Sequence, residues 1–256
     1  MKSFCFTVDD NIRFLKEITE RKPKSIFEHP YLCMMRRLHE RFGVKIQLNL
    51  FWCMPGFDLS MTDGGYASEW QAASDWLKLS FHSRLENVRP YQSSGYDEVF
   101  ADLRAVNGEI LRFAGKSSLA DTTTVHYCQT TDDGNRALSD CGVKGLLGLF
   151  GTSEYPSTSY SIPFELAEKA RQGELVSTHG LTVGSIDLVI NTVGLDRIEP
   201  ILSEFTDRPQ IRVMIHEQYF YGDYKNYQPD FEEKLALALG FLAKKGYESR
   251  FFEEMI

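Results

Sequence analysis

Strand-like and helix-like segments alternate along most of this 256-residue chain, and this alternation constrains the fold more than any other feature. Apolar residues occupy every second position in the segments 44–50 and 77–81, as in β-strands, whose side chains repeat with a period of two. Between residues 31 and 42, apolar residues recur at helical spacing, with Pro30 suited to the first turn and Gly43 to the C-terminal end. Strands that alternate with helices predict an α/β protein with a mainly parallel sheet.

The remaining segments extend this pattern to about seven strands. A first strand ends near residue 9, further helices are expected over 99–110 and 231–242, and further strands over 122–127, 145–150, 183–190 and 211–216. No linker rich in proline, serine or glycine divides the chain, and it has no glycine-rich phosphate loop of the kind that marks open doubly wound sheets. We therefore predict one domain over residues 1–256, a distorted TIM-like (β/α) barrel of seven or eight strands.

Composition excludes several classes of partner. The formal net charge is −8, whereas nucleic-acid binding needs concentrated lysine and arginine, so we expect no nucleic-acid partner. No stretch approaches the roughly 18 apolar residues of a membrane helix, and no apolar signal segment precedes the first strand. The five cysteines are scattered and never spaced Cys-x-x-Cys, which favours reduced thiols over a disulfide framework. We expect a cytoplasmic protein without a membrane partner.

Polar groups follow three of the predicted strands. The carboxylates of Asp9 and Asp10 end the first strand, His82 follows the third and His216 follows the last. A parallel barrel brings these strand ends to one rim, where side chains far apart in the sequence converge on one pocket. Two neighbouring aspartates can divide the work there, one as a metal ligand and the other as a general base. The alternative is that the aspartates simply cap the helix that begins near Asn11.

Three short motifs resemble those of the polysaccharide deacetylase family, metal-dependent carbohydrate esterases with a distorted β/α barrel. The family's Thr-Phe-Asp-Asp motif is similar to Thr7-Val8-Asp9-Asp10. Its His-Ser/Thr-x-x-His motif is similar to the segment from His82 to Glu86, and its final Leu-x-His is similar to Met214-Ile215-His216. The motifs stand at predicted strand ends and in the family's order.

The resemblance implies a role for four of these residues. Asp10 and His82 are expected to bind a divalent metal. Asp9 is then the general base and His216 the general acid of an acyl hydrolysis.

The third metal ligand is where this chain departs from the family. The family usually has a second histidine four residues after the first, and this chain has Glu86 there. We expect Glu86 to be the third ligand, with His126, at the end of the fourth strand, as its competitor. Zinc accepts histidine and carboxylate ligands together, and a more oxygen-rich set also suits manganese or cobalt.

The substrate is expected to be a small molecule or an oligosaccharide. The segment after His216 is both aromatic and polar, and loops after barrel strands carry specificity. Tyr219 and Tyr221, together with His126, are therefore expected to contact the substrate. Asp187, near the end of the penultimate strand, is expected to orient His216.

The leading hypothesis is a metal-dependent hydrolase that removes an acyl group from an N-acylated sugar or hydrolyses a related C–N amide bond. One alternative is a catalytically inactive barrel that acts as a carbohydrate-binding or scaffold protein. It is suggested by Glu86 in place of a histidine and by the lack of a counterpart to the family's arginine-proline-aromatic side-wall motif. Another is a metal-free glycosidase that uses Asp9 and a second carboxylate. Metal content and sensitivity to chelators separate these three hypotheses.

Overall fold

The core of the molecule is a barrel of parallel strands. The computed structural model describes residues 2–86, 90–150 and 159–256. The barrel wall consists of β1 (Ser3–Asn11), β2 (Ile46–Met54), β4 (Leu77–Leu85), β5 (Thr122–Thr123), β6 (Gly145–Gly148), β8 (Leu181–Ser185), β9 (Leu188–Val189) and β10 (Gln210–His216). One sheet has the order β9-β10-β1-β2-β4 and a second has the order β5-β6-β8, and all these neighbouring pairs are parallel.

Two irregular junctions close the wall. Between the sheets, the Ala120 N–H donates to the Leu79 carbonyl at 2.9 Å and the Thr123 hydroxyl donates to the Phe81 carbonyl, so β5 lies beside β4. On the other side, β8 leads almost directly into β9, and the two act as one bent wall position. In the described part of the chain the wall therefore has seven positions. The predicted α/β class and distorted barrel are confirmed.

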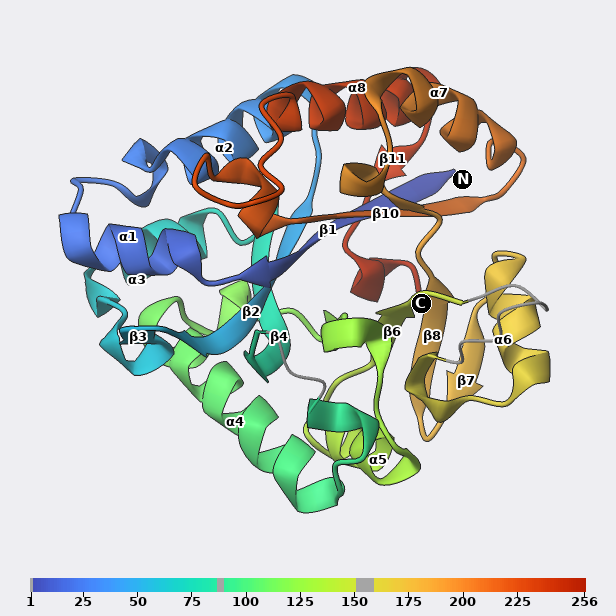
Figure 1. The fold of residues 1–256 in the computed structure, drawn as a ribbon, viewed down its shortest axis with the longest axis horizontal. Coiled ribbons are helices and arrows are strands. Elements are labelled where there is room, and N and C mark those ends of the chain that lie inside the picture. The colour runs from blue at the N-terminus through green and yellow to red at the C-terminus, as the bar shows by residue number, and fades with distance from the viewer. Residues whose placement is uncertain (1, 87–89, 151–158) are drawn as a thin grey trace.

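Helices surround the barrel (Figure 1). They are α1 (Arg13–Arg21), α2 (Pro30–Phe42), α3 (Ala67–Ala72), α4 (Tyr96–Phe113), α5 (Asp132–Asp140), α6 (Phe164–Arg171), α7 (Leu195–Glu204) and α8 (Phe231–Lys244). Three short strands extend the sheets, with β3 (Phe57–Asp58) beside β2, β7 (Val176–Thr178) beside β8 and β11 (Glu248–Ser249) beside β1. Within the described ranges, none of the helices combines the length and apolar character that crossing a membrane requires.

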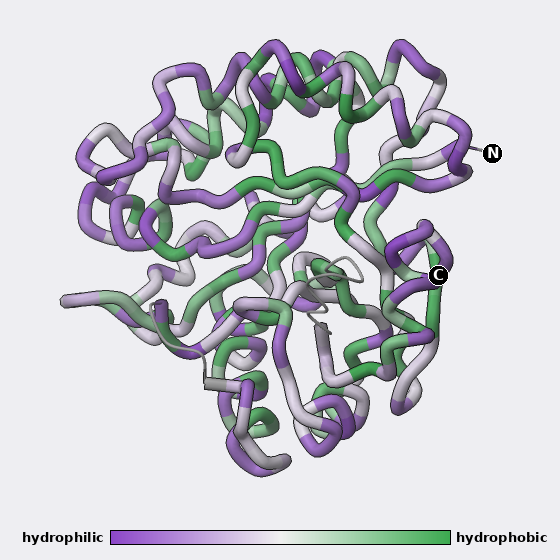
Figure 2. Tube along the Cα trace, turned by 45° about the vertical axis from the view of Figure 1, so that its right-hand side comes forward, coloured by the Kyte–Doolittle hydropathy of each residue, from purple (hydrophilic) through white to green (hydrophobic). Residues whose placement is uncertain are grey.

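The wall strands have two buried faces that differ in character. On β1, Phe4, Phe6 and Val8 belong to the main apolar core that packs under the helices, and Cys5 and Asp9 alternate with them. Figure 2 shows hydrophobic residues concentrated along the central strands. A second, smaller apolar cluster includes Cys5 of β1 and reaches the pocket described below at Met214; it consists of Cys5, Leu147, Ile186, Met214, Phe252 and Met255. The remaining inward positions nearer the carboxyl ends are polar, and these positions build the site.

Three predicted strands are shorter than expected, and segment 145–150 is reduced to the four residues of β6. Segment 122–127 has only the two residues of β5, followed by the 3-10 turn η6 (His126–Cys128). Tyr127 and Cys128 in this turn have φ angles of 58° and 55°, which no strand allows. Segment 183–190 is split into β8 and β9. The turn η6 lies at the rim, where its residues His126 and Tyr127 line the pocket described below.

Candidate metal centre and active site

A β-bulge places two consecutive carboxylates on the same side of β1. Val8 pairs with Leu48 and Asn11 with Leu50, so β1 has one residue more than β2 between these pairs. Asp10 has a φ of 62°, a left-handed conformation that is uncommon outside glycine. Neighbours in a regular strand point to opposite faces, whereas a bulge redirects one of them. Asp9 and Asp10 consequently both line one pocket at the barrel rim.

Asn11 holds this bulge in place, and its role was not predicted. Its Nδ2 donates to the Val8 carbonyl at 2.6 Å and to the Asn49 carbonyl at 3.2 Å, and its Oδ1 accepts a hydrogen bond from the Tyr31 hydroxyl at 2.8 Å. The side chain is fully buried. A polar residue directly after the aspartate pair is the only signal in the sequence.

Asp10, His82 and His126 bring three potential metal ligands together. The Asp10 Oδ1 lies 3.0 Å from the His82 Nε2 and 3.2 Å from the His126 Nδ1, and the two nitrogens are 3.1 Å apart. These are the residues in the described part of the chain whose donor atoms converge in this way. Three ligands held tetrahedrally at about 2.0–2.1 Å from zinc lie about 3.3 Å from one another. The group therefore fits a divalent metal in both chemistry and spacing.

Surrounding contacts orient the three side chains and set their protonation. The His82 Nδ1 lies 2.5 Å from the Thr124 carbonyl, a contact that places a hydrogen on Nδ1 and turns Nε2 toward Asp10. Burial lowers the pKa of His126, which favours its neutral ring. Burial opposes ionisation of Asp10, but hydrogen bonds from His126 and His82 bring the pKa of that carboxyl well below its usual range. Asp9 and Asp10 raise the pKa of His82 against the effect of its burial, which favours a proton on Nε2 that is donated to Asp10; a bound metal ion would take the place of that proton.

Glu86 does not belong to this group. Strand β4 continues to Leu85, so the four residues from His82 to Glu86 cover about 13 Å of extended chain, whereas on a helix they would be neighbours. Glu86 is exposed and lies on the wall of the pocket, where burial of its carboxyl and the nearby Asp10 raise its pKa. The predicted meeting of Asp10 and His82 is observed, with His126 beside them in the position expected for Glu86.

A chain of amides orients Asp9. Asn49 donates to the Asp9 Oδ1 at 2.6 Å, and Gln47 donates to the Asn49 Oδ1 at 2.8 Å. Thr122 fixes Gln47 in turn, donating to its Oε1 at 3.0 Å while its carbonyl accepts from the Gln47 Nε2 at 2.9 Å. Burial raises the pKa of Asp9, although His82 and His216 oppose this shift. A buried carboxyl with a raised pKa is suited to accept a proton.

His216 pairs with Asp9 across the β1–β10 ladder, and the residue that contacts its imidazole ring is not the predicted Asp187. The His216 Nδ1 is 2.9 Å from the Asn191 Oδ1. The prediction that Asp187 orients His216 is wrong. Asp187 instead accepts hydrogen bonds from the Arg208 guanidinium at 2.5 Å and from the backbone N–H of Arg212 at 2.8 Å. Arg212 lies four residues before His216 on β10. The chemical type expected, an acceptor beside the ring, is present, but from a different residue.

The segment after β10 folds back onto the site as the 3-10 helix η9 (Glu217–Phe220). Gln218, which was not predicted, donates to the Asp10 Oδ2 at 2.6 Å and so occupies the oxygen that does not face the histidines. Tyr219 lines the pocket, with its ring centroid 6.1 Å from that of His216.

Tyr221 lies outside this pocket. Its hydroxyl donates to the Glu217 carboxylate at 2.7 Å, and the Arg13 guanidinium covers its ring at 4.0 Å. Glu217 also accepts the N–H groups of Ile12, Arg13 and Phe14 at 2.7–3.1 Å, which caps α1. Burial raises the pKa of Glu217 to about 7 even though four hydrogen bonds favour the ionised form. Tyr221 thus has a structural partner at the start of α1.

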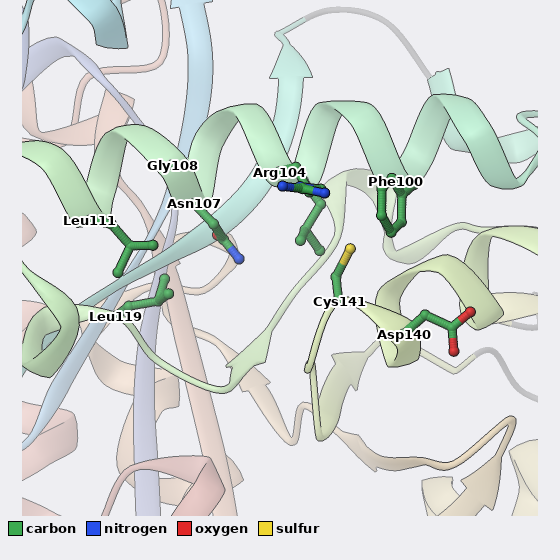
Figure 3. A pocket seen from close by; sticks show the side chains of 9 residues that line it. Phe100, Arg104, Asn107, Gly108, Leu111, Leu119, Asp140 and Cys141 are labelled. Carbon is green, nitrogen blue, oxygen red and sulfur yellow. The ribbon is translucent and has the colours of Figure 1, made fainter.

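The pocket itself is a cavity of about 350 Å³, within the size range of ligand sites. Aromatic side chains line it at two places, Tyr127 on one side and Tyr219 with Tyr224 on the other. A separate groove lies along α4, where Leu111 and Asn107 lie opposite Leu119, and Arg104 lies opposite Cys141 at the end of α5 (Figure 3). It shares no residue with the pocket at the rim.

Comparison with known proteins identifies structures that share this fold. No family model and no curated protein sequence matches this chain. Solved structures do match. A 4-α-glucanotransferase from Thermococcus litoralis has a TM-score of 0.62 at 12% identity, covering 99% of this chain, which spans 40% of that protein. A family 4 acetyl xylan esterase from Clostridium thermocellum, in complex with cobalt, has a TM-score of 0.55 at 11% identity over 99% of this chain and 90% of the esterase.

A third match is a peptidoglycan N-acetylglucosamine deacetylase in complex with a hydroxamate-type benzamide. Its TM-score is 0.50 at 10% identity, over 99% of this chain and 87% of that protein. At 10–12% identity these likenesses concern the fold alone. At the level of the fold, they confirm the resemblance predicted from the three motifs. This chain has the distorted β/α barrel fold of the polysaccharide deacetylases.

Proposed function

We propose that this protein is a metal-dependent hydrolase that removes an acyl group from an N-acylated sugar or hydrolyses a related C–N amide bond. One observation carries the proposal: Asp10, His82 and His126 form a compact donor group in the same pocket that contains Asp9 and His216. A set of metal ligands alone can serve many functions. A set of metal ligands beside a buried carboxyl and an imidazole provides the Lewis acid site, the base and the acid that acyl hydrolysis needs.

Asp10, His82 and His126 would hold the metal, with zinc first and manganese or cobalt as alternatives. A divalent ion bound there supplies a Lewis acid that polarises the acyl oxygen and acidifies water. Gln218 keeps the second oxygen of Asp10 occupied, which leaves the first oxygen for the ion. The Thr124 carbonyl supports His82 in the same way.

Asp9 and His216 divide the proton transfers. As the oxygen of a water molecule bonds to the acyl carbon, Asp9 accepts a proton from that water. As the C–N bond breaks, the His216 Nε2 donates a proton to the departing nitrogen. The products are a carboxylic acid and an amine. The pairing of Asp9 with His216 on adjacent strands supports this division, because it places base and acid on one side of the pocket.

The aromatic walls support a carbohydrate substrate. Tyr127, Tyr219 and Tyr224 offer ring faces on which the C–H surface of a sugar can pack. The acetyl xylan esterase and the N-acetylglucosamine deacetylase among the structural matches act on acylated carbohydrates by their names. We propose a small-molecule or oligosaccharide substrate, and a cytoplasmic location in keeping with the five free cysteines.

The alternative of an inactive carbohydrate-binding barrel is not favoured. It rested in part on Glu86 as an unsuitable third ligand, and His126 removes that part of the reasoning.

Two substitutions test the proposal. Asp10→Ala should abolish both zinc binding and hydrolysis of N-acetylated sugar oligomers. Asp9→Asn should leave zinc binding intact and lower kcat about 10²- to 10⁴-fold, the usual contribution of a general base. Calorimetric zinc titration and an assay of released acetate give the two readouts. Equal loss of zinc from both variants would contradict the role of Asp9. A wild-type protein that binds no transition metal, or whose activity survives chelators, would contradict the proposed function.

A further inference from the structure

Asn191 is the residue that contacts the imidazole of His216 from behind the pocket. It lies in the 3-10 turn η8 (Ile190–Thr192), directly after β9, and is 6% exposed. Its Oδ1 is 2.9 Å from the His216 Nδ1. Its amide also acts on the Tyr219 hydroxyl, lowering the pKa of that group against the effect of burial. The amide therefore contacts His216 and influences Tyr219.

The backbone of Asn191 is anchored as firmly as its side chain. Its carbonyl accepts a hydrogen bond from the Gln228 Nε2 at 2.7 Å, and the Gln228 Oε1 accepts one from the Lys234 Nζ at 3.0 Å. Lys234, on α8, is itself buried. These hydrogen bonds connect η8 to α8 through Gln228 and so hold Asn191 in place beside His216.

The chemistry of an amide oxygen determines the state of the ring it contacts. The Asn191 Oδ1 accepts hydrogen bonds and cannot donate them, so the His216 Nδ1 must carry a hydrogen in both the neutral and the cationic ring. The neutral ring then has its lone pair on Nε2, the atom left for the pocket. A carboxylate in the same place would impose the same tautomer, but it would also add a negative charge beside the ring and raise the pKa of the histidine.

We propose that Asn191 is a positioning residue that holds His216 as the Nδ1–H tautomer, with Nε2 available to substrate, and that it does so without adding a charge. The consequence for proton donation rests on the proposed function. The tautomer itself is independent of it. His216 can then exchange a proton with a bound molecule only through Nε2.

The test is nitrogen-15 NMR of the histidine side chains, with and without added zinc. The protein has six histidines, and the signal that disappears in His216→Gln assigns His216. We expect the neutral ring of His216 in the wild-type protein to show a protonated Nδ1 and an unprotonated Nε2. A protonated Nε2 in the neutral ring would overturn the proposal, and this reading needs no variant at Asn191 to fold.

Asn191→Asp adds a charge without changing the shape of the side chain. We expect it to keep the tautomer and to raise the pH midpoint of the His216 titration by about 1 unit or more, as an opposite charge at hydrogen-bond distance does. Other titratable groups around His216 are present in both proteins and cancel in the comparison; they are Asp9, Asp10, His82, Glu86, His126, Tyr127, Cys128, Tyr219 and Tyr224. Asn107→Asp, in the separate groove along α4, makes the same chemical change and should leave the His216 midpoint unchanged.

The pH dependence of kcat/KM separates this inference from the proposed function. If His216 acts as a general acid, the alkaline limb of the kcat/KM profile should move in Asn191→Asp by the same amount as the NMR midpoint. An unmoved NMR midpoint in Asn191→Asp would overturn the inference. A shifted midpoint in a protein that hydrolyses no acyl amide would leave Asn191 as the residue that positions His216 and would contradict the hydrolase instead.

Discussion

The third metal ligand gives the sharpest prediction. The sequence pattern indicates Glu86, whereas the convergence of donor atoms indicates His126. Substituting each residue in turn separates the two, because they come from different parts of the fold. His126 belongs to the turn η6, and Glu86 follows the end of β4.

The expected magnitudes follow from the geometry. The His126 Nδ1 lies 3.2 Å from the Asp10 Oδ1 and 3.1 Å from the His82 Nε2, so His126→Ala removes one of three converging donors. Removing a residue that merely supports a ligand weakens metal binding 10- to 100-fold, so loss of the ligand itself should exceed about 100-fold. That factor corresponds to at least about 2.7 kcal/mol of binding free energy.

Glu86→Gln should have a much smaller effect. The Glu86 side chain is exposed at the pocket wall, and it acts on the ion only through its charge. A carboxylate on the order of 10 Å from a doubly charged ion contributes about 0.8 kcal/mol in water, a factor of about four, and less in salt. The two variants should therefore differ in zinc affinity by a factor of at least about 25.

Competition with a chromophoric zinc chelator measures both affinities on one scale. His179→Ala is the matched control, since His179 contacts Asp132 away from the pocket at 3.0 Å, and it should bind zinc like the wild type. Urea unfolding of metal-free protein verifies that His126→Ala remains folded. A loss of affinity in Glu86→Gln that equals or exceeds the loss in His126→Ala would refute the assignment of His126.

Two further predictions concern residues that the sequence did not single out. Gln218→Met keeps the length of the side chain but removes its hydrogen bond to the Asp10 Oδ2; zinc affinity should fall about 10- to 100-fold by the same competition assay, and an unchanged affinity would show that Gln218 does not orient Asp10. Phe252→Ala should lower the free energy of unfolding by about 3–5 kcal/mol in urea, because this ring is 1% exposed within the small apolar cluster. A loss below about 1 kcal/mol would mean that the cluster contributes little to the stability of the barrel.

The elements that carry a strong local pattern could be predicted from the sequence. Helix α2 begins at Pro30 and ends before Gly43, whose φ of 64° suits a glycine. The meeting of Asp10 and His82 could also be predicted, because it requires only that the carboxyl ends of parallel strands share a rim. Local periodicity and one topological rule are sufficient for both results.

Contacts between distant segments could not be predicted in the same way. Asn191 reaches His216 across 25 residues, and Gln218 reaches Asp10 across 208. No local pattern marks a residue whose partner is chosen by tertiary packing. Asp187 and Asn191 are polar residues on either side of β9, and only the register of β9 against β10 decides which one meets His216.

The alternating pattern of β2 could be recognised in the sequence, but the location of its polar side chains could not. Gln47 and Asn49 alternate with the apolar residues of β2, as residues on a solvent face would. Both are buried, because the opposite face of a barrel strand is the barrel interior. There they connect Thr122 to Asp9 through hydrogen bonds. A polar residue inside a barrel wall is therefore better evidence for a site than the same residue on an open sheet.

Bulges explain why the ligands converge where regular strands would separate them. Leu50 and Phe51 are consecutive on β2, but their partners on β4 are Phe81 and Ser83, which makes His82 the extra residue of that strand. The bulge in β1 likewise falls at Asp9 and Asp10. Both strands that flank β2 thus depart from regular pairing at the residues proposed to bind metal. Since a bulge shifts a side chain relative to its neighbours on both faces, straightening either strand would redirect its ligand away from the other two. The geometry of the proposed metal centre is in this sense a property of the backbone register, which the order of residue types does not reveal.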